Sequence, residues 1–472
     1  MTPAPAAASP AAPVDAAASA RRPASMLAPW LLAAGLIALR NPTALFRAEF
    51  WAEDGTVFFR DALLRGAASL AMPVYGYCLS LARAIAWVAT FFPVVGTPYV
   101  YAVAALAVNA FTVAYLSRPG FEWLIPKRAH RILVACLLTL APGAGETFLN
   151  ISNLTNCLGL LALLMLIETP RELGALKFAA LVAIGLSSGH MVILLPLILY
   201  LWVRDRRRSH LFLLIALFPI VAANFLGNQR SGAATGLLDY SRFLVAPLVI
   251  VENFVVRLFF APFLGSELTG GFMKTPAWVF WPLALGALAA AAWGVRRARP
   301  DRETTRILVL SDLLTVSTFG IIVVSRSYAF EKVQRESGNI MWGVRYSFLP
   351  GVMADLIWMA ALIALARGAT MGTGAAGVGA AGGGAGGGNG RRVAWLARAA
   401  IVVLCFNNVA RWHGVYRRHD AHWPESAARV QAVLDRRARG ELQVPTEVPG
   451  IQMHPMGTGM EWLTVTIPPS DR

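Results

Sequence analysis

The chain has 472 residues, of which 57% are hydrophobic and 14% are charged. A soluble domain is nearer to half apolar and about a quarter charged, so this composition excludes an ordinary soluble enzyme and predicts an integral membrane protein. The formal charge of +16 would suit a nucleic-acid-binding protein, but the Arg residues fall in short clusters between apolar segments, as they do in cytoplasmic loops. We therefore expect no nucleic acid as a partner. The clusters lie at 118–131, 204–208, 296–306 and 391–398.

The N-terminus, residues 1–24, is rich in Ala and Pro and predicts a disordered cytoplasmic tail. Arg21 and Arg22 precede the first apolar segment, residues 26–46, in a layout that resembles a signal peptide. No convincing small-x-small cleavage site follows this segment. We therefore expect an uncleaved first helix whose N-terminus is cytoplasmic.

Three carboxylates, Glu49, Glu53 and Asp54, follow the first apolar segment in the run Glu49-Phe-Trp-Ala-Glu-Asp-Gly-Thr56. A charge next to hydrocarbon costs several kcal/mol unless it is solvated, paired or used in function, so acids at a membrane edge are candidates for a functional site. The alternative is that they cap the next helix, residues 56–64, where acids interact favourably with the helix dipole.

Each membrane crossing needs about 20 mainly apolar residues. Two apolar stretches, 70–93 and 243–264, are expected to lie in the outer interface, because a crossing there would place the basic loop 118–131 outside. Arg83 interrupts the first stretch, which suits an interfacial helix. The predicted fold is an all-α integral membrane protein with eleven transmembrane helices and two interfacial helices. The eleven segments are 26–46, 98–117, 131–147, 154–168, 174–188, 190–203, 211–226, 276–295, 306–325, 345–366 and 393–410.

The rest of the chain divides around these segments. The short run Trp462–Ile467 has the pattern of a strand, and the C-terminal tail that contains it is predicted to be a small cap or docking segment. The predicted parts are the tail 1–24, a polytopic transmembrane domain over 25–366, a Gly/Ala-rich flexible linker over 367–391, a last transmembrane helix over 392–410, and an extracytoplasmic tail over 411–472.

This topology places the unusual polar residues on the extracytoplasmic side. Asn150, Asn153 and Asn156 repeat every three residues, so they are predicted to share one face of a helix as it enters the membrane. A polar stripe there should face a cavity or a neighbouring helix. Other polar and aromatic candidates on this side are Trp51, Tyr75, Tyr77, Arg83, His190, Arg345 and Tyr346.

Several of these residues carry a resemblance. The chain resembles the polytopic GT-C-type glycosyltransferases, in particular bacterial members with an acidic first loop. The matching pieces are Glu53-Asp54-Gly55, Tyr75-Gly-Tyr77 with Arg83, the segment Asn150 to Asn156, and Arg345-Tyr-Ser-Phe-Leu-Pro350. The resemblance implies a multi-pass protein of the bacterial inner membrane. It also implies transfer of a sugar from a polyprenyl-phosphate donor to a glycan, lipid or protein acceptor of the cell envelope on the extracytoplasmic face.

Two tasks follow from that reaction. The acceptor hydroxyl must lose a proton, which we assign to Asp54 as general base, with Glu53 as a second acid. Carboxylates are also ligands for Mg²⁺ or Mn²⁺, so Asp54 and Glu53 are possible metal ligands, although two carboxylates are too few to demand a divalent cation. Glu49, Asn150, Asn153 and Tyr346 complete the predicted substrate-binding set.

The remaining candidates each have a second interpretation. Arg345 suits a lipid phosphate, or is an interfacial Arg paired with Glu331 or Glu336. His190 is a proton shuttle or metal ligand, or is simply hydrogen-bonded at a helix start. The aromatic rings of Trp51, Tyr75 and Tyr77 stack on a sugar or prenyl chain, or anchor the protein at the interface.

Two other functions remain open. A lipid-linked sugar flippase or transporter needs polar groups near the bilayer midplane and internal repeats, and no clear repeat is visible. A glycan ligase or polymerase should rely on a large outer loop late in the chain, for which residues 325–345 are a modest candidate.

Overall fold

The computed structural model describes residues 25–74, 78–140, 147–169, 172–230, 422–452 and 462–469, together with scattered positions between 260 and 406. Several predictions lie wholly or largely outside these residues. They are the tail 1–24, the interfacial stretch 243–264, the spans 276–295, 306–325 and 345–366, and the linker 367–391.

The first helix leads directly into the acidic loop. Helix α1 (Leu27–Arg40) stops before Pro42, because a residue that precedes proline is disfavoured in the helical conformation. After the single turn α2 (Thr43–Phe46), the chain passes through the acidic motif into a π-helical turn, η2 (Asp54–Phe59), and then α3 (Arg60–Arg65). Gly66 ends α3 with a φ of +53°, which glycine adopts at little cost, and the 3-10 turn η3 (Gly66–Ala71) follows.

The central helix is α5 (Thr97–Ala114). The 3-10 turns η4 (Val94–Gly96) and η5 (Tyr115–Ser117) extend it into a segment of 24 residues, Val94–Ser117. Helices α1, α4 (Ser80–Ala89), α6 (Arg128–Leu140) and α8 (Leu154–Ile167) all pack against α5. The indole Nε1 of Trp30 on α1 donates a hydrogen bond to the carbonyl of Ala107 at 3.1 Å.

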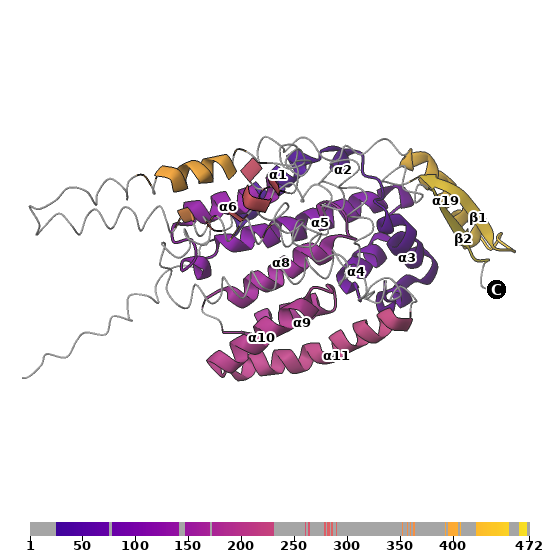
Figure 1. The fold of residues 1–472 in the computed structure, drawn as a ribbon. Helices are drawn as coiled ribbons and strands as arrows, with labels where there is room; N and C mark the ends of the chain where they lie inside the picture. The colour runs from indigo at the N-terminus through magenta and orange to yellow at the C-terminus, as the bar shows by residue number, and fades with distance from the viewer. Residues whose placement is uncertain are drawn as a thin grey trace, which may run out of the picture.

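A second group of helices covers the other side of α8. Every residue of α8 except Thr155 is buried, because α5 lies on one side of it and α9 (Ala175–Gly185) and α10 (Met191–Asp205) lie on the other. Helix α11 (Arg208–Arg230) packs on α9 and α10. Helix α8 therefore lies between α5 on one side and the layer formed by α9, α10 and α11 on the other (Figure 1).

The C-terminal tail folds into a small unit of one helix and two strands. Helix α19 (Trp423–Ala438) packs on an antiparallel pair formed by β1 (Thr446–Gln452) and β2 (Trp462–Ile467). The strand register is irregular between Val448 and Ile451, where Pro449 lacks the N–H that a regular ladder needs. Strand β2 covers the run that the sequence predicts as a strand. The unit lies at the end of the molecule that also holds α3 and α4 (Figure 1).

The helical class is confirmed, but the prediction of eleven transmembrane helices is not supported. Among the described residues, Val94–Ser117 is the one helix long and apolar enough to cross a membrane, and 61% of its most apolar window is buried within the protein, as also occurs in the core of a soluble protein. Helices α1 and α8 have 14 residues each, or about 21 Å, against a hydrocarbon core of about 30 Å. The predicted span 26–46 is longer than α1, which ends at Arg40, whereas α8 covers nearly all of the predicted span 154–168.

Candidate functional site

The acidic motif is held in a tight turn against the core. The carbonyl of Trp51 accepts the N–H of Asp54 at 2.7 Å, and the carbonyl of Ala52 accepts the N–H groups of Gly55 and Thr56 at 3.2 Å each. Ala52 has a φ of +35°, which is unfavourable for a residue with a Cβ. Such strain persists only where the surrounding structure fixes it, and the buried ring of Phe50 next to the turn supplies part of that anchorage.

The carboxylate of Asp54 joins this loop to a segment nearly one hundred residues away. Its Oδ1 accepts the backbone N–H of Ser152 at 2.9 Å, and the residue is only 3% exposed. The structure therefore brings the acidic loop and the Asn-rich segment together, although they are distant in sequence. It also places one oxygen of Asp54 on a backbone amide, which limits that oxygen as a free base.

The Asn-rich segment is a turn, and the predicted helical stripe is wrong. Asn150 Oδ1 accepts the N–H of Asn153 at 2.9 Å and the hydroxyl of Ser152 at 3.1 Å, while its Nδ2 donates to the carbonyl of Phe148 at 3.2 Å. Helix α8 begins only at Leu154, with Asn153 at its N-cap position, so Asn156 alone is helical. Local hydrogen bonding by asparagine side chains favours a turn over a helix, which explains the difference.

Glu53 is the more accessible acid of the pair. It occupies the N-cap position of η2, with Asp54 in the first turn, so both acids lie where the helix dipole favours a negative charge, although Glu53 makes no side-chain capping hydrogen bond. Its side chain is half-buried, and its carboxylate has no hydrogen bond or ion pair with any residue that the structure describes. Glu49 is 7% exposed and lies on the buried side of the same loop.

Arg83 lies in the protein interior, although the sequence predicts an interfacial, substrate-binding residue. The side chain is 1% exposed, and its Nη1 lies 2.8 Å from Asp61 Oδ2. Its Nε donates to the carbonyl of Met72 at 3.2 Å, and the guanidinium lies over the ring of Phe58. The partner Asp61 on α3 was not among the predicted residues. This ion pair fixes α4 to α3 and leaves Arg83 little capacity for a ligand.

The structure places His190 in a small hydrogen-bonded cluster, as the simpler interpretation expects. Its Nδ1 lies 3.3 Å from the hydroxyl of Ser188 and 3.4 Å from that of Thr155. The Ser188 hydroxyl also donates to the carbonyl of Thr155 at 2.8 Å. A Cβ on Gly159 would lie only 2.8 Å from His190 Cβ, so the imidazole sits close against α8. The cluster joins the start of α10 to the first turn of α8.

The other predicted residues divide into buried and undescribed ones. Trp51 is 4% exposed, so its ring belongs to the core and is not positioned to stack on a sugar from solution. Within the described parts of the chain, no group of three or more His, Cys, Asp and Glu side chains could hold a metal ion, and the acid pair alone is a small ligand set. Tyr75, Tyr77, Arg345 and Tyr346 lie outside the described residues.

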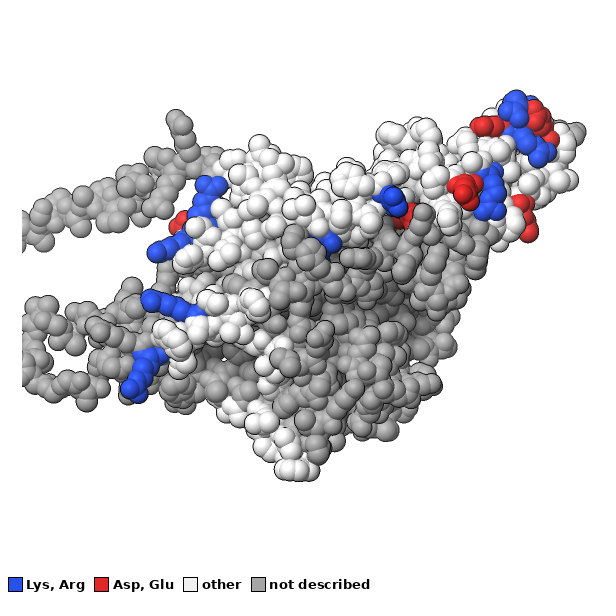
Figure 2. Space-filling model, turned by 90° about the horizontal axis from the view of Figure 1, so that it is seen from above, with Lys and Arg blue, Asp and Glu red and all other residues white. Residues whose placement is uncertain are grey.

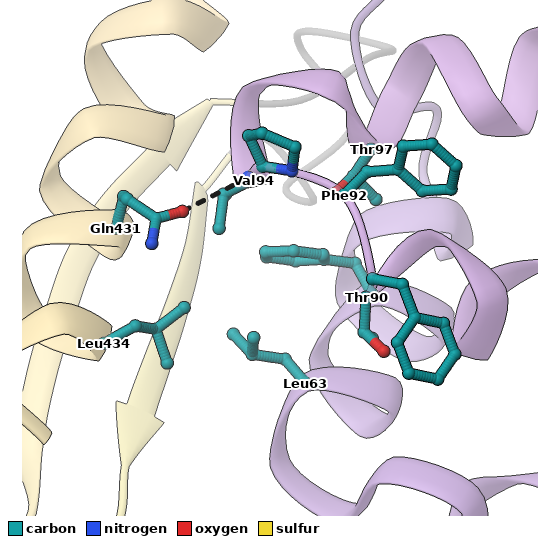
Figure 3. A pocket seen from close by; sticks show the side chains of 10 residues that line it. Leu63, Thr90, Phe92, Val94, Thr97, Gln431 and Leu434 are labelled. Carbon is teal, nitrogen blue, oxygen red and sulfur yellow. Dashed lines mark hydrogen bonds between the residues drawn. The ribbon is translucent and has the colours of Figure 1, made fainter. Parts of the chain in front are cut away.

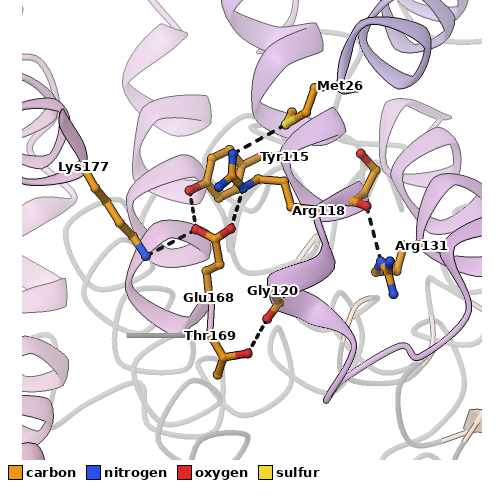
Figure 4. A network of polar contacts seen from close by, with 9 residues as sticks. Met26, Tyr115, Arg118, Gly120, Arg131, Glu168, Thr169 and Lys177 are labelled. Atoms are coloured by element: carbon orange, nitrogen blue, oxygen red, sulfur yellow. Dashed lines mark hydrogen bonds and ion pairs between the residues drawn. The ribbon is translucent and has the colours of Figure 1, made fainter. Parts of the chain in front are cut away.

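A second polar cluster, centred on Glu168, was not predicted. Oε2 of this buried carboxylate accepts the Tyr115 hydroxyl at 2.6 Å and lies 3.3 Å from Lys177 Nζ, while Oε1 accepts the Nε–H of Arg118 (Figure 4). Burial acts to lower the pKa of Arg118, but the hydrogen bond and the charge of Glu168 outweigh it and raise that pKa above its ordinary value. The cluster joins the ends of α5 and α8 to the start of α9.

Charge is distributed unevenly between the two ends of α5. The end that holds Glu168 carries nine Lys or Arg and four Asp or Glu over the described positions of 118–131, 168–177 and 204–208, a net charge of +5. The acidic end carries four of each sign over 47–83 and is neutral. Figure 2 shows Lys and Arg side chains gathered at one end of the helices, whereas the C-terminal unit at the opposite end carries both signs.

Two polar side chains of α5 are buried without hydrogen bonds. The hydroxyl of Tyr101 and both amide atoms of Asn109 have no partner among the described residues, and the two residues are 1% and 0% exposed. The ring of Tyr101 lies 5.5 Å from that of Phe50, beside the acidic loop. Unpaired polar groups inside a protein are costly and for this reason mark positions where a ligand or water is needed.

Comparisons with known proteins add no relative. No family model matches the chain, and no similar curated protein or solved structure is found. The site is therefore interpreted from its own geometry.

Proposed function

We propose that the chain is a membrane glycosyltransferase that moves a sugar from a polyprenyl-phosphate donor to a cell-envelope acceptor on the extracytoplasmic face. The observation that carries the proposal is the geometry of the acid pair. Asp54 is anchored to Ser152 by a 2.9 Å hydrogen bond, while the neighbouring Glu53 is half-buried and unpaired among the described residues. A carboxylate that is held in place by its neighbour and left free to accept a proton suits general-base catalysis.

The proposed orientation follows from the charges at the two ends of α5. Basic residues concentrate on the cytoplasmic side of membrane proteins, and the Glu168 end carries the net charge of +5. If Val94–Ser117 crosses the bilayer, the acidic loop lies at the extracytoplasmic surface, where a lipid-linked donor presents its head group. The eleven-helix arrangement in the bacterial inner membrane remains part of this proposal.

In the proposed reaction, the acceptor oxygen attacks the anomeric carbon of the donor sugar. The bond from that carbon to the phosphate oxygen breaks, and the lipid phosphate leaves with the bonding electrons. Glu53 takes the acceptor proton, and the fixed Asp54 holds the loop in register. The exposed Arg47 precedes the acids in the same loop and suits the negative charge that develops on the departing phosphate. Arg345 remains a predicted second cation.

The proposal is tested by transfer itself. Purified protein in liposomes receives a radiolabelled polyprenyl-phosphate sugar and an envelope extract from cells that lack the protein. Label should pass to the extract only when the protein is present, and mass spectrometry should find one added sugar. An added oligosaccharide would indicate a ligase, and no transfer above empty liposomes would contradict the proposal.

One observation favours the alternative of a flippase or transporter for lipid-linked sugars. Asn109 lies near the middle of Val94–Ser117 and its amide is buried without a partner among the described residues. Polar groups near the bilayer midplane are a feature of transporters. Movement of a fluorescent lipid-linked sugar between leaflets of liposomes, lost in Asn109→Leu and kept in Glu53→Gln, would establish this alternative.

A further inference from the structure

A pocket lies between the C-terminal unit and the turn that precedes α5. Its volume is about 350 Å³, and α19 forms one wall, with α3 and residues 90–97 opposite. Figure 3 shows Gln431 and Leu434 on α19 facing Val94, Leu63 and Thr90 across this space. The lining residues are Phe59, Leu63, Thr90, Phe91, Phe92, Pro93, Val94, Thr97, Gln431 and Leu434.

The C-terminal unit is firmly docked at this pocket. The indole of Trp423 is 1% exposed, and its Nε1 donates to the carbonyl of Val95 at 3.1 Å. Its ring lies 4.5 Å from that of Phe50 and 5.8 Å from that of Phe59, measured between centroids. Gln431 Oε1 accepts the N–H of Val94 at 3.3 Å. The pocket is therefore enclosed between two parts of the chain that are held together by buried contacts.

The pocket adjoins the acid pair through a single short helix. Asp54 is the first residue of η2 and Phe59, which lines the pocket, is the last. The Phe59 ring also contacts Phe50, on the other side of the acidic turn, with centroids 4.8 Å apart. A ligand in the pocket thus lies next to the element that carries the acids.

The lining chemistry defines the ligand class. None of the lining side chains is charged, so nothing there would compensate a phosphate or a carboxylate. Thr97 has no hydrogen bond to a described residue, and Gln431 keeps one amide hydrogen after donating to Asp435 at 2.9 Å. A hydrocarbon chain would leave these polar groups unsatisfied. Phe91 and Phe92, which are 71% and 52% exposed, and Phe59 are the aromatic residues of the lining.

We infer that this pocket binds an uncharged carbohydrate, as the subsite for the acceptor glycan. The inference rests on the proposed function. Aromatic faces pack against the C–H faces of a sugar ring, while neutral hydroxyl and amide groups exchange hydrogen bonds with its hydroxyls. The volume is at the small end of ligand sites and suits about one or two sugar rings. Glu53 directly precedes η2, whose last residue, Phe59, lines this pocket.

The test measures binding without transfer. Full-length protein in lipid nanodiscs is titrated with maltose and with lactose as uncharged probes, and with inorganic phosphate and dodecanol as charged and hydrocarbon probes. At least one of the two disaccharides should bind, whereas phosphate and dodecanol should not compete with it. Leu434→Trp, which fills the pocket, should weaken binding at least tenfold, and Thr97→Val, which removes only a hydroxyl, about threefold to tenfold. Leu176→Trp is the matched control, because Leu176 is 86% exposed on α9.

The carbohydrate assignment would be overturned if neither disaccharide bound, or if dodecanol displaced the bound sugar. It would also be overturned if both single variants, Leu434→Trp and Thr97→Val, bound the sugar as tightly as the wild type. Binding is repeated in Glu53→Gln, where it should be unchanged. If the wild type binds sugar but transfers none, the sugar subsite is supported and the proposed function is contradicted. If it transfers sugar but does not bind the probes, the proposed function is supported and the subsite is contradicted.

Discussion

The Oδ1 atom of Asp54 lies 2.9 Å from the backbone nitrogen of Ser152, and this hydrogen bond joins the acidic loop to the turn before α8. Both residues lie next to strained backbone, since Ala52 and Leu149 have φ values of +35° and +63°. The bond anchors the Asp54 carboxylate, and in the proposed function Glu53 is the acid that meets the substrate.

Removal of the Asp54 carboxylate should destabilise the protein only when the acceptor oxygen is lost. Asp54→Asn keeps an oxygen for the Ser152 N–H, so its thermal unfolding in detergent should stay close to wild type. Asp54→Ala leaves the amide without this acceptor and should cost about 1–3 kcal/mol. The exposed Glu447→Ala is the control and should change little. Equal stability of Asp54→Ala and Asp54→Asn would show that the hydrogen bond is not a structural anchor.

The buried pair Arg83–Asp61 should behave as a unit. Arg83→Met alone leaves the Asp61 carboxylate in the interior without this partner and should cost about 3–5 kcal/mol. The double variant Arg83→Met with Asp61→Leu removes both charges and should recover much of that loss. A double-mutant cycle on thermal unfolding measures the coupling, and simple addition of the two single effects would disprove it. The exposed pair Arg439–Glu441 provides a comparison in which little coupling is expected.

Gly120 should tolerate no side chain. A Cβ there would lie 2.3 Å from Glu168 Cγ and 2.5 Å from the carbonyl oxygen of Thr169. Thr169 is held in this position because its N–H donates a hydrogen bond to the carbonyl of Gly120 at 3.0 Å. Gly120→Ala should therefore lower the folded yield and cost at least about 1–3 kcal/mol. Gly35→Ala is the matched control, because nothing lies within 4 Å of its Cβ, and helix α1 should become slightly more stable. Normal folding of Gly120→Ala would show that Glu168 and Thr169 can move enough to accommodate a methyl group.

The orientation is tested by matched Arg→Cys substitutions at the two ends of α5. Arg60 lies at the acidic end and Arg128 at the basic end, and both are exposed. In a chain whose four native cysteines are replaced by serine, a membrane-impermeant maleimide should label Arg60→Cys in spheroplasts and Arg128→Cys only after the membrane is opened. Labelling of both positions in spheroplasts, or the reverse order, would contradict the proposed topology.

The sequence allowed the helical class and the strand at Trp462–Ile467 to be predicted, because composition and local patterns carry those signals. It could not show that Asp61 pairs with Arg83, that Glu168 binds Arg118, or that Trp423 packs on Phe50. Each of these contacts depends on how distant segments meet in space. The end of α1 at Arg40 and the turn at Asn150 also differ from the prediction, whereas α8 and α10 closely match their predicted spans. Helix ends depend on turns and tertiary contacts as well as on hydropathy.

The central claim is that Glu53 accepts the proton in sugar transfer at the membrane surface. The most direct measurement compares label transfer from a polyprenyl-phosphate sugar by wild type, Glu53→Gln and Asp54→Asn, at equal amounts of folded protein in liposomes. Glu53→Gln keeps the size of the side chain and removes the base, so transfer should fall by about 10²–10⁴-fold. Asp54→Asn should lose less than Glu53→Gln, because its anchoring oxygen remains. Full transfer by Glu53→Gln would contradict the account.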